Sequence, residues 1–490
     1  MDSPWQILGI TSVAALGVYF FFTHGRRGRY RLPPKPWGWP VLGNIPQLIG
    51  GKGVYYKLLG FREKYGDLFR VQMGTQTLFV VFGRRYFHEL LIEKGDIVSK
   101  RPSWLYTPHQ LTHGKGIIWS NGKAWQTMQA LLRKAQEDST VVSALQRHLT
   151  AEYEEFQNYL KDESSTYSLE YLIRQASFNF LSAFLIGKRF GYNDSTFNEM
   201  RDKIESYGFS MATVNIENYI PLLAFLNKSK IQKATSDQEF VYGILRENVD
   251  ERRRLTNDPP ESFLQMYLSQ PEDERMKEGM SELDALRAIV DMYVGGRDNL
   301  ITYIKWILMT FAKYPDIQSK CRAEIQEVTG RDRRIRLDDR TKTPYTLATV
   351  KELLRMRAPV VLAPFHTPTE DITLGEYDIP KGSIILVDCK APCYDGKAWS
   401  DPEVFNPERF LGGSEQLLPK SCFVPYGTGS RYCIGKYVGN IFQYMFTAHI
   451  LQDFQIMTRH PDTELSMEDN FDIFGLRPQH FDEIIMKPLG

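Results

Sequence analysis

The chain has 490 residues and a net charge of +1, and 42% of its residues are hydrophobic. This balance is ordinary for a globular protein and argues against a disordered one. Because no block of basic residues dominates, the composition also excludes a global nucleic-acid-binding protein. The five cysteines match neither a disulfide framework nor the spacing of a zinc site, so we expect a reducing compartment.

The first predicted element is a transmembrane signal-anchor at residues 1–25. Ile7 to Phe22 carry no charge, and with their flanks they approach the thickness of a thin bilayer. By the positive-inside rule, the arginines that follow keep the rest of the chain cytosolic: Arg26, Arg27, Arg29 and Arg31. A cleaved signal peptide is the alternative, although its charges normally precede the apolar run. We expect a basic, proline-rich hinge at 26–44 and one folded domain at 45–490.

Most of that domain has a helical pattern. Two strands are predicted around Gly74, within residues 65–82. Helices are expected at Trp125–Ala135, Tyr153–Leu160, Tyr167–Leu185 and Ser281–Lys313. The last helix has an acidic start and a basic end, which suits the helix dipole. The adjacent Gly295 and Gly296 weaken it and indicate close approach by a ligand or a kink. We therefore predict a mainly α protein with a minor β portion.

The strongest chemical signal is the segment YGTGSRYCIG, from Tyr426 to Gly435. Its glycines let a tight loop approach a flat ligand closely. Cys433 opens an apolar segment, Ile434 to Ile450, that is predicted to be a helix, and a helix N-terminus stabilises a thiolate. Arg431 can pair with an anionic group on the same ligand. A buried structural cysteine in a glycine-rich turn is the alternative.

This segment resembles the haem-binding signature of the cytochrome P450 family, Phe-x-x-Gly-x-Arg-x-Cys-x-Gly, with Tyr426 in place of phenylalanine. Glu352 and Arg355, together with Arg409, resemble the buried charged triad that the family places behind the haem. Further stretches resemble the animal microsomal drug- and steroid-oxidising branch: LPPKPWGWPVLGN, YPDIQSKCRAEIQEVTGRD, PYTLATVKELLR, EYDIPKGSIIL and DPEVFNPERFL. The resemblance implies the cytochrome P450 fold with a long central helix, and a haem-thiolate catalytic domain at 45–490.

The resemblance also implies roles for single residues. Cys433 matches the axial ligand of the iron of haem b, whose thiolate favours O–O cleavage. Other positions that match cofactor contacts are Arg431, Arg101, Trp125, His366, Gln129 and Gly296. Without the resemblance, the alternative interpretations are a core residue for Trp125, a loop histidine for His366 and a surface residue for Arg101. Gln129 replaces an arginine, so it keeps a hydrogen bond but loses the charge.

The expected substrate pocket is mostly apolar, which suits a lipophilic ligand. By resemblance, the loop from Pro102 to Ile118 lies over the haem. The other expected wall residues come from the long helix and from the β portion: Val294, Gly295, Val361, Leu362, Phe474 and Leu476.

One departure from the family concerns the oxygen-activating motif of the long helix. Asp298 keeps the expected acid, but Asn299 stands where the family has threonine. An amide can hold a water, because it both donates and accepts hydrogen bonds. Asn299 then replaces threonine with altered efficiency, or Thr302 one turn later assists, or the substrate already carries its oxygen.

The implied activity is O2-dependent monooxygenation of a sterol or steroid, a fatty acid or a foreign compound. Electrons would come from NADPH-cytochrome P450 reductase, and candidate docking charges are Arg133, Lys134 and Lys436. The implied location is the endoplasmic reticulum membrane with a cytosolic catalytic domain. The apolar segment from Tyr219 to Leu226 either contacts membrane lipid or belongs to the core. Two alternatives stay open: a haem-thiolate isomerase or dehydratase, and a non-catalytic haem-binding membrane protein.

Overall fold

The computed structural model describes residues 30–489, apart from 163, 165, 212–214, 255–257, 331, 413–418, 420, 461, 463 and 472–474. The predicted anchor at 1–25 and the pocket residue Phe474 lie outside these residues. Across the described part of the chain, no helix has both the length and the apolar character needed to cross a membrane.

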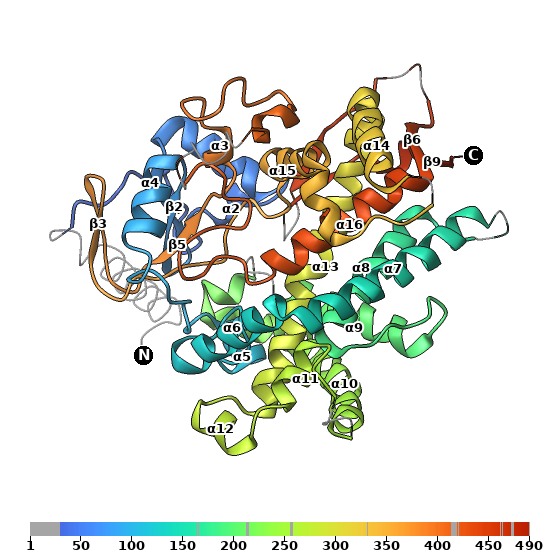
Figure 1. Cartoon of the computed structure of the whole chain (residues 1–490). Coiled ribbons are helices and arrows are strands. Elements are labelled where there is room, and N and C mark those ends of the chain that lie inside the picture. The colour runs from blue at the N-terminus through green and yellow to red at the C-terminus, as the bar shows by residue number, and fades with distance from the viewer. Residues whose placement is uncertain are drawn as a thin grey trace, which may run out of the picture.

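Helices make up most of the structure (Figure 1). The α-helices are α2 (Ile45–Leu48), α3 (Val54–Tyr65), α4 (Arg84–His88), α5 (Tyr106–Thr112), α6 (Gly122–Glu137), α7 (Ser139–Lys161), α8 (Leu169–Ile186), α9 (Ser195–Ser210), α10 (Lys228–Arg253), α11 (Phe263–Leu268), α12 (Glu272–Lys277), α13 (Glu282–Lys313), α14 (Pro315–Thr329), α15 (Pro344–Arg357) and α16 (Lys436–Asp453). Short π- or 3-10 turns are η1 (Glu89–Glu93), η2 (Ile216–Asn218), η3 (Pro221–Asn227), η4 (Leu337–Lys342), η5 (Ala391–Tyr394), η6 (Pro407–Phe410) and η8 (Phe481–Glu483).

The strands form small sheets. They are β1 (Leu68–Met73), β2 (Gln76–Val81), β3 (Ile372–Leu374), β4 (Tyr377–Ile379), β5 (Ile384–Val387), β6 (Phe454–Thr458), β7 (Asp469–Phe471), β8 (Leu476–Pro478) and β9 (Ile484–Pro488). The predicted hairpin around Gly74 is confirmed, because β1 and β2 pair antiparallel on either side of it. β5 extends this sheet by pairing parallel with β2, and the other strands form two-stranded pairs. The sheet that contains β2 and β5 lies at one side of the structure, together with β3, while β6 and β9 lie at the opposite side near the C-terminus (Figure 1). The prediction of a mainly α chain with a minor β portion is confirmed.

The long central helix is confirmed as α13, which crosses the middle of the molecule (Figure 1). Ser281 caps its N-terminus in a capping box with Asp284, which satisfies backbone N–H groups that lack helical partners. The helix continues without interruption through the two glycines. A Cβ on Gly296 would lie 3.0 Å from the Cδ2 atom of Leu181, so α13 and α8 pack closely here. The predicted cofactor contact of Gly296 stays a prediction.

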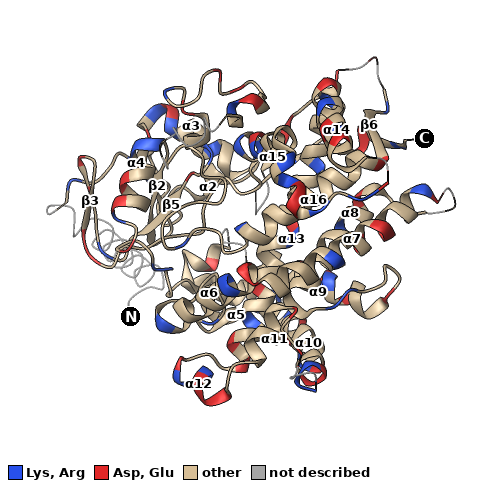
Figure 2. Cartoon of the chain, in the orientation of Figure 1, with Lys and Arg blue, Asp and Glu red and all other residues tan. Residues whose placement is uncertain are grey.

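The other predicted helices also exist, with shifted ends. The predicted segments lie almost entirely within α6, α7 and α8, and the first two of these helices are longer than predicted. The helix expected from Ile434 begins later, at Lys436, because Gly435 is its N-cap. Cys433 therefore lies in the loop before α16 and not on its first turn. Positions of Lys and Arg are interspersed with positions of Asp and Glu along the outer helices, as Figure 2 shows.

Candidate active site

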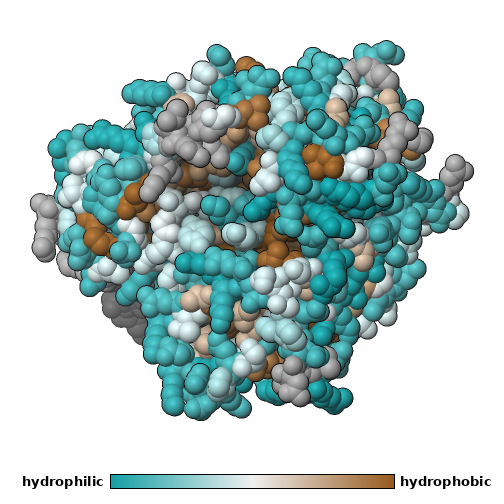
Figure 3. All heavy atoms as spheres, viewed as in Figure 1, coloured by the Kyte–Doolittle hydropathy of each residue, from teal (hydrophilic) through white to brown (hydrophobic). Residues whose placement is uncertain are grey.

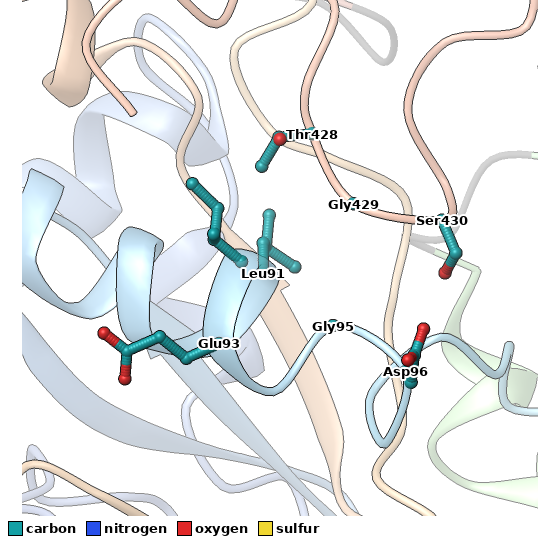
Figure 4. Close-up of a pocket in the computed structure, with 8 residues that line it drawn as sticks. Leu91, Glu93, Gly95, Asp96, Thr428, Gly429 and Ser430 are labelled. Carbon is teal, nitrogen blue, oxygen red and sulfur yellow. The ribbon is translucent and has the colours of Figure 1, made fainter. Parts of the chain in front are cut away.

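Cys433 lies in a tight loop that is held from behind by η1. The backbone N–H of Cys433 donates to the carbonyl of Tyr426 at 2.8 Å, which closes the loop. Gly429 has a φ of +74°, and a Cβ there would lie 2.6 Å from the carbonyl oxygen of Leu91. Only glycine permits this contact. Figure 4 shows Gly429 near Leu91, beside a small pocket of about 190 Å³.

The sulfur of Cys433 faces an internal space. Its side chain is exposed, and yet burial raises the pKa of the thiol, while the N–H of Gly435 and the charge of Lys436 oppose that rise. The exposure of the side chain and the raised pKa of the thiol agree if the sulfur borders an open space that is itself surrounded by protein. A Cβ on Gly435 would lie 3.9 Å from both Cys433 Sγ and Met292 Cε. The middle of α13 therefore lies next to the cysteine loop.

One face of α13 borders this space. Gly295 is exposed in the middle of the helix, and a Cβ there would meet only the Cδ1 atom of Ile118, at 4.0 Å. Asn299, one turn further, lies on the same face and donates from Nδ2 to the carbonyl of Gly295 at 2.6 Å. Figure 3 shows apolar side chains deep in a hollow on the viewed face. Gly295 therefore adjoins open space on the face of α13 that also carries Asn299.

Arg431 is fixed in the interior by backbone carbonyls. Its Nε donates to Ser99 O at 2.7 Å, and its Nη2 donates to Ser120 O at 2.7 Å and to Asn121 Oδ1 at 2.9 Å. The guanidinium carbon lies 3.6 Å from the ring centre of Trp125, a cation–π contact. Its remaining nitrogen, Nη1, is buried and has no hydrogen-bond partner in the described residues.

Arg101 brings a second positive charge to the same place. It is buried, and its Nη1 donates to the carbonyls of Pro364 and Phe365 at 2.9 Å. Burial lowers the pKa of Arg101 to about 10. Burial and the neighbouring Arg101 lower the pKa of Arg431 to about 8. His366 is buried beside them, and its Nδ1–H donates to Val98 O at 2.9 Å.

These residues fit a flat ligand with an anionic edge. Neither Arg101 nor Arg431 forms a salt bridge with a carboxylate of the described chain. Buried charges of one sign are costly without a counter-charge, so an anion beside the unpartnered Nη1 of Arg431 would stabilise both. Haem b has such an edge in its propionates, and Cys433 presents a sulfur to the same interior. The structure thus brings together Cys433, Arg431, Arg101, Trp125 and His366.

Gln129 serves the cysteine loop in a different way. Its Nε2 donates to the carbonyl of Ser430 at 2.9 Å, so α6 holds the loop two residues after Thr428. The amide supports the loop backbone and adds no charge to the cation pair.

Glu352, Arg355 and Arg409 form a buried charged cluster. Arg355 donates to both carboxylate oxygens of Glu352, at 2.7 and 2.8 Å. Arg409 Nε adds a bond of 3.3 Å, and the backbone N–H of Asn406 adds one of 2.9 Å. Because each buried charge has charged or polar partners, the cluster can lie in the interior. It joins α15 to η6, on the segment that leads to the cysteine loop.

The acid of α13 points along a different side of the helix. Asp298 is buried, and its Oδ2 lies 3.1 Å from Arg297 Nη2 and 3.4 Å from Arg477 Nη2. Thr302, one turn later, is also buried. Asn299 is thus the most exposed polar side chain of this motif.

The expected pocket walls are apolar and largely buried. Val294, Val361 and Leu476 are buried, and Leu362 is half-buried. The backbone N–H of Leu476 donates to Pro359 O at 3.0 Å, which joins the two β-side segments. The loop after Arg101 also borders a separate pocket of about 260 Å³, lined by Pro102, Ser103, Pro108, His109, Thr112, Gly114, Trp119 and Asn121.

Sequence reasoning missed Asn121. Its Oδ1 accepts from the backbone N–H of Arg101 and from Arg431 Nη2, and its Nδ2 donates to Arg101 O at 3.1 Å. One amide therefore joins the backbone of Arg101 to the guanidinium of Arg431. Its position just before α6 is typical of an N-cap residue, and this was the available signal.

Comparisons with known proteins agree with this geometry. Residues 33–483 match the family model described as Cytochrome P450. The chain is 28% identical over 476 residues to Cytochrome P450 1A1 of Oryctolagus cuniculus, which covers 93% of this chain and 90% of the relative. It is 27% identical over 439 residues to Cytochrome P450 2C16 of the same species, covering 88% and 89%. Cytochrome P450 1A5 of Gallus gallus is 25% identical over 479 residues, covering 93% and 89%.

Neutralising the buried carboxylate should destabilise the fold strongly. Glu352→Gln leaves two buried guanidinium groups without their counter-charge, which costs about 3–5 kcal/mol. Glu408→Gln is the matched control, because Glu408 is exposed and its carboxylate forms a surface ion pair with Lys320, at 3.7 Å. Urea unfolding of the full-length protein measures both. Equal stability losses in the two variants would contradict the account of the cluster.

His366 should make stability depend on acid. Burial, then the charges of Arg101 and Arg431, lowers the pKa of His366 to about 3 in the folded protein. An unfolded histidine titrates near 6.5, so this contribution is complete above about pH 6.5 and is lost as the pH falls toward 3. In unfolding experiments, the stability advantage of the native protein over His366→Asn should therefore shrink across that interval. The exposed His460 provides the control, and an advantage of His366 that is constant with pH would be the contrary result.

Proposed function

The chain belongs to the cytochrome P450 family and is a monooxygenase of that family, and on this premise we propose that its substrate is a lipophilic small molecule and that its electrons come from NADPH-cytochrome P450 reductase. The substrate classes that suit the walls are a sterol or steroid, a fatty acid or a foreign compound. The observation that carries the proposal is that the loop of Cys433 lies next to the middle of α13, where Gly295 is exposed and Asn299 is half-buried.

The family's haem b supplies the iron at which O2 is reduced and one oxygen atom is transferred to the substrate. Cys433 is the candidate ligand of that iron. Arg101 and Arg431 provide positive charge for the anionic edge of the group, with His366 and Trp125 beside them. Because carbonyl groups on several segments hold both guanidiniums, their positions are set before any ligand binds.

The polar groups of α13 can organise protons beside the substrate. The Nδ2 of Asn299 is engaged by the Gly295 carbonyl, so its Oδ1 is the atom that can accept a hydrogen bond from water. Thr302 lies one turn further and Asp298 lies beside Asn299 in sequence. We assign catalytic roles to these three residues, with Asn299 in the place nearest the substrate.

Apolar side chains favour a lipophilic substrate and membrane association. Leu222, Phe225 and Leu226 of η3 are exposed, as are Trp37 and Trp39 of the hinge. Both segments contact the β1–β2 turn: Gly74 N–H donates to Leu42 O at 3.2 Å, and Thr75 N–H donates to Tyr219 O at 3.0 Å. They therefore lie at one part of the surface, and such a patch is typical of a membrane contact. We place the domain on the cytosolic face of the endoplasmic reticulum membrane.

If this surface enters the membrane, Trp37 and Trp39 should lie near lipid. In vesicles that carry the full-length chain, lipids brominated on the acyl chain should quench a variant that retains only these two tryptophans. A variant that retains only the buried Trp399 is the control. Equal quenching of the two variants would argue that the patch faces water.

The catalytic proposal is tested with the full-length enzyme, reductase, NADPH and isotope-labelled O2. We expect labelled product only when reductase is present. Asn299→Thr should raise the product formed per NADPH consumed, because a hydroxyl both donates to the Gly295 carbonyl and rotates more freely than the amide. Turnover of a peroxide without reductase, abolished by Asn299→Thr, would instead identify an isomerase or dehydratase in which Asn299 has a specific role.

A further inference from the structure

Arg297 is an arginine in the interior of α13, and it is 1% exposed. Arginine is rarely buried so completely unless it is paired. Its Nη1 lies 3.3 Å from Glu205 Oε2 of α9, and its Nη2 lies 3.1 Å from Asp298 Oδ2. One guanidinium therefore bridges a carboxylate of α9 to the carboxylate that precedes Asn299.

The bridge continues at both ends. Beyond Asp298, Arg477 of β8 places its Nη2 3.4 Å from the same Oδ2 atom. Beyond Glu205, Arg174 of α8 forms a salt bridge with Oε2. Arg297 and Asp298 are buried, whereas the outer members are partly exposed. The charges thus form a path from the surface between α8 and α9 to the helix turn that bears Asn299.

Electrostatics favours the charged form of Asp298 in this arrangement. An opposite charge within about 4–6 Å favours the charged carboxylate and lowers its pKa by about 1–3. Here two guanidinium groups approach one oxygen, and the contact with Arg297 is screened least because both partners are buried. The next charged pairs along α13 are Arg287 with Asp291, and Lys305 with Glu170 of α8, each about two turns away.

We propose that Arg297 is a positioning residue for oxygen activation: it holds Asp298 as a charged carboxylate turned toward β8. In this state Asp298 accepts hydrogen bonds from water beside Asn299 and does not itself donate a proton. Protons then reach the substrate side of α13 through that water. This inference rests on the proposed monooxygenase function, because only that function requires protons at Asn299.

The first test measures the ionisation of Asp298 in the holoenzyme by infrared difference spectroscopy during a pH titration. Asp298→Asn assigns the carboxylic acid band. Arg297→Gln should move the titration midpoint of Asp298 upward by about one to three pH units. Glu205→Gln breaks the same contact between α9 and α13 but removes a negative charge, so the midpoint should stay or fall.

The opposite responses separate electrostatics from simple loosening of the fold. If both variants moved the midpoint upward, or if Arg297→Gln left it unchanged, the proposal would be wrong. Should Arg297→Gln fail to fold, Arg477→Gln replaces it, because that half-exposed position removes the other guanidinium. The midpoint should again rise, by about half the shift for the buried pair, or about 0.5 to 1.5 pH units; an unchanged midpoint there would also overturn the proposal.

The second test follows product per NADPH against pH with reductase. The native enzyme and Glu205→Gln should give flat profiles near neutral pH. Arg297→Gln should lose coupling as the pH falls below its new midpoint. If neither the native enzyme nor any variant forms product, but the infrared midpoints shift as predicted, the monooxygenase proposal is wrong and the assignment of a charged Asp298 still holds. A flat profile for Arg297→Gln in an active enzyme would contradict the role of Arg297.

Discussion

Two positive charges in the interior, Arg101 and Arg431, constrain the architecture around Cys433. Like charges repel strongly in a medium of low dielectric constant, so the chain must surround them with acceptors. Carbonyls at Ser99 and Ser120 and those at Pro364 and Phe365 supply these acceptors, and the Asn121 amide joins the Arg101 backbone to the Arg431 guanidinium. Segments far apart in the sequence are thereby fixed relative to the cysteine loop. The repulsion between the two guanidinium groups is fully offset only when an anion lies beside them.

The long helix divides its polar groups between two sides. Gly295 and Asn299 face the enclosed space next to the cysteine loop, while Arg297 and Asp298 turn toward α9 and β8. Chemistry that needs both an apolar substrate and protons benefits from this division. The substrate meets few charges, and the charges that order water remain paired within the protein.

Much of the fold and part of the site could be predicted from the sequence. α13 was predictable because its cap, its length and Pro315 are local signals, and Cys433 because its motif is contiguous. The bridge from Glu205 through Arg297 to Asp298 was not predictable, because helix packing alone brings α9 to α13. The close contact of Gly296 with Leu181 of α8 was not predictable for the same reason. Phe474 and the anchor at 1–25 stay predictions.

The central claim is that the Cys433 thiolate binds haem iron, and the absorption spectrum of the reduced, carbon monoxide-bound full-length protein tests it most directly. We expect a strongly red-shifted Soret band for the native protein and loss of that band in Cys433→Ala. A native protein whose Soret band stays at the shorter wavelength of a haem without thiolate, and does not change in Cys433→Ala, would contradict the account.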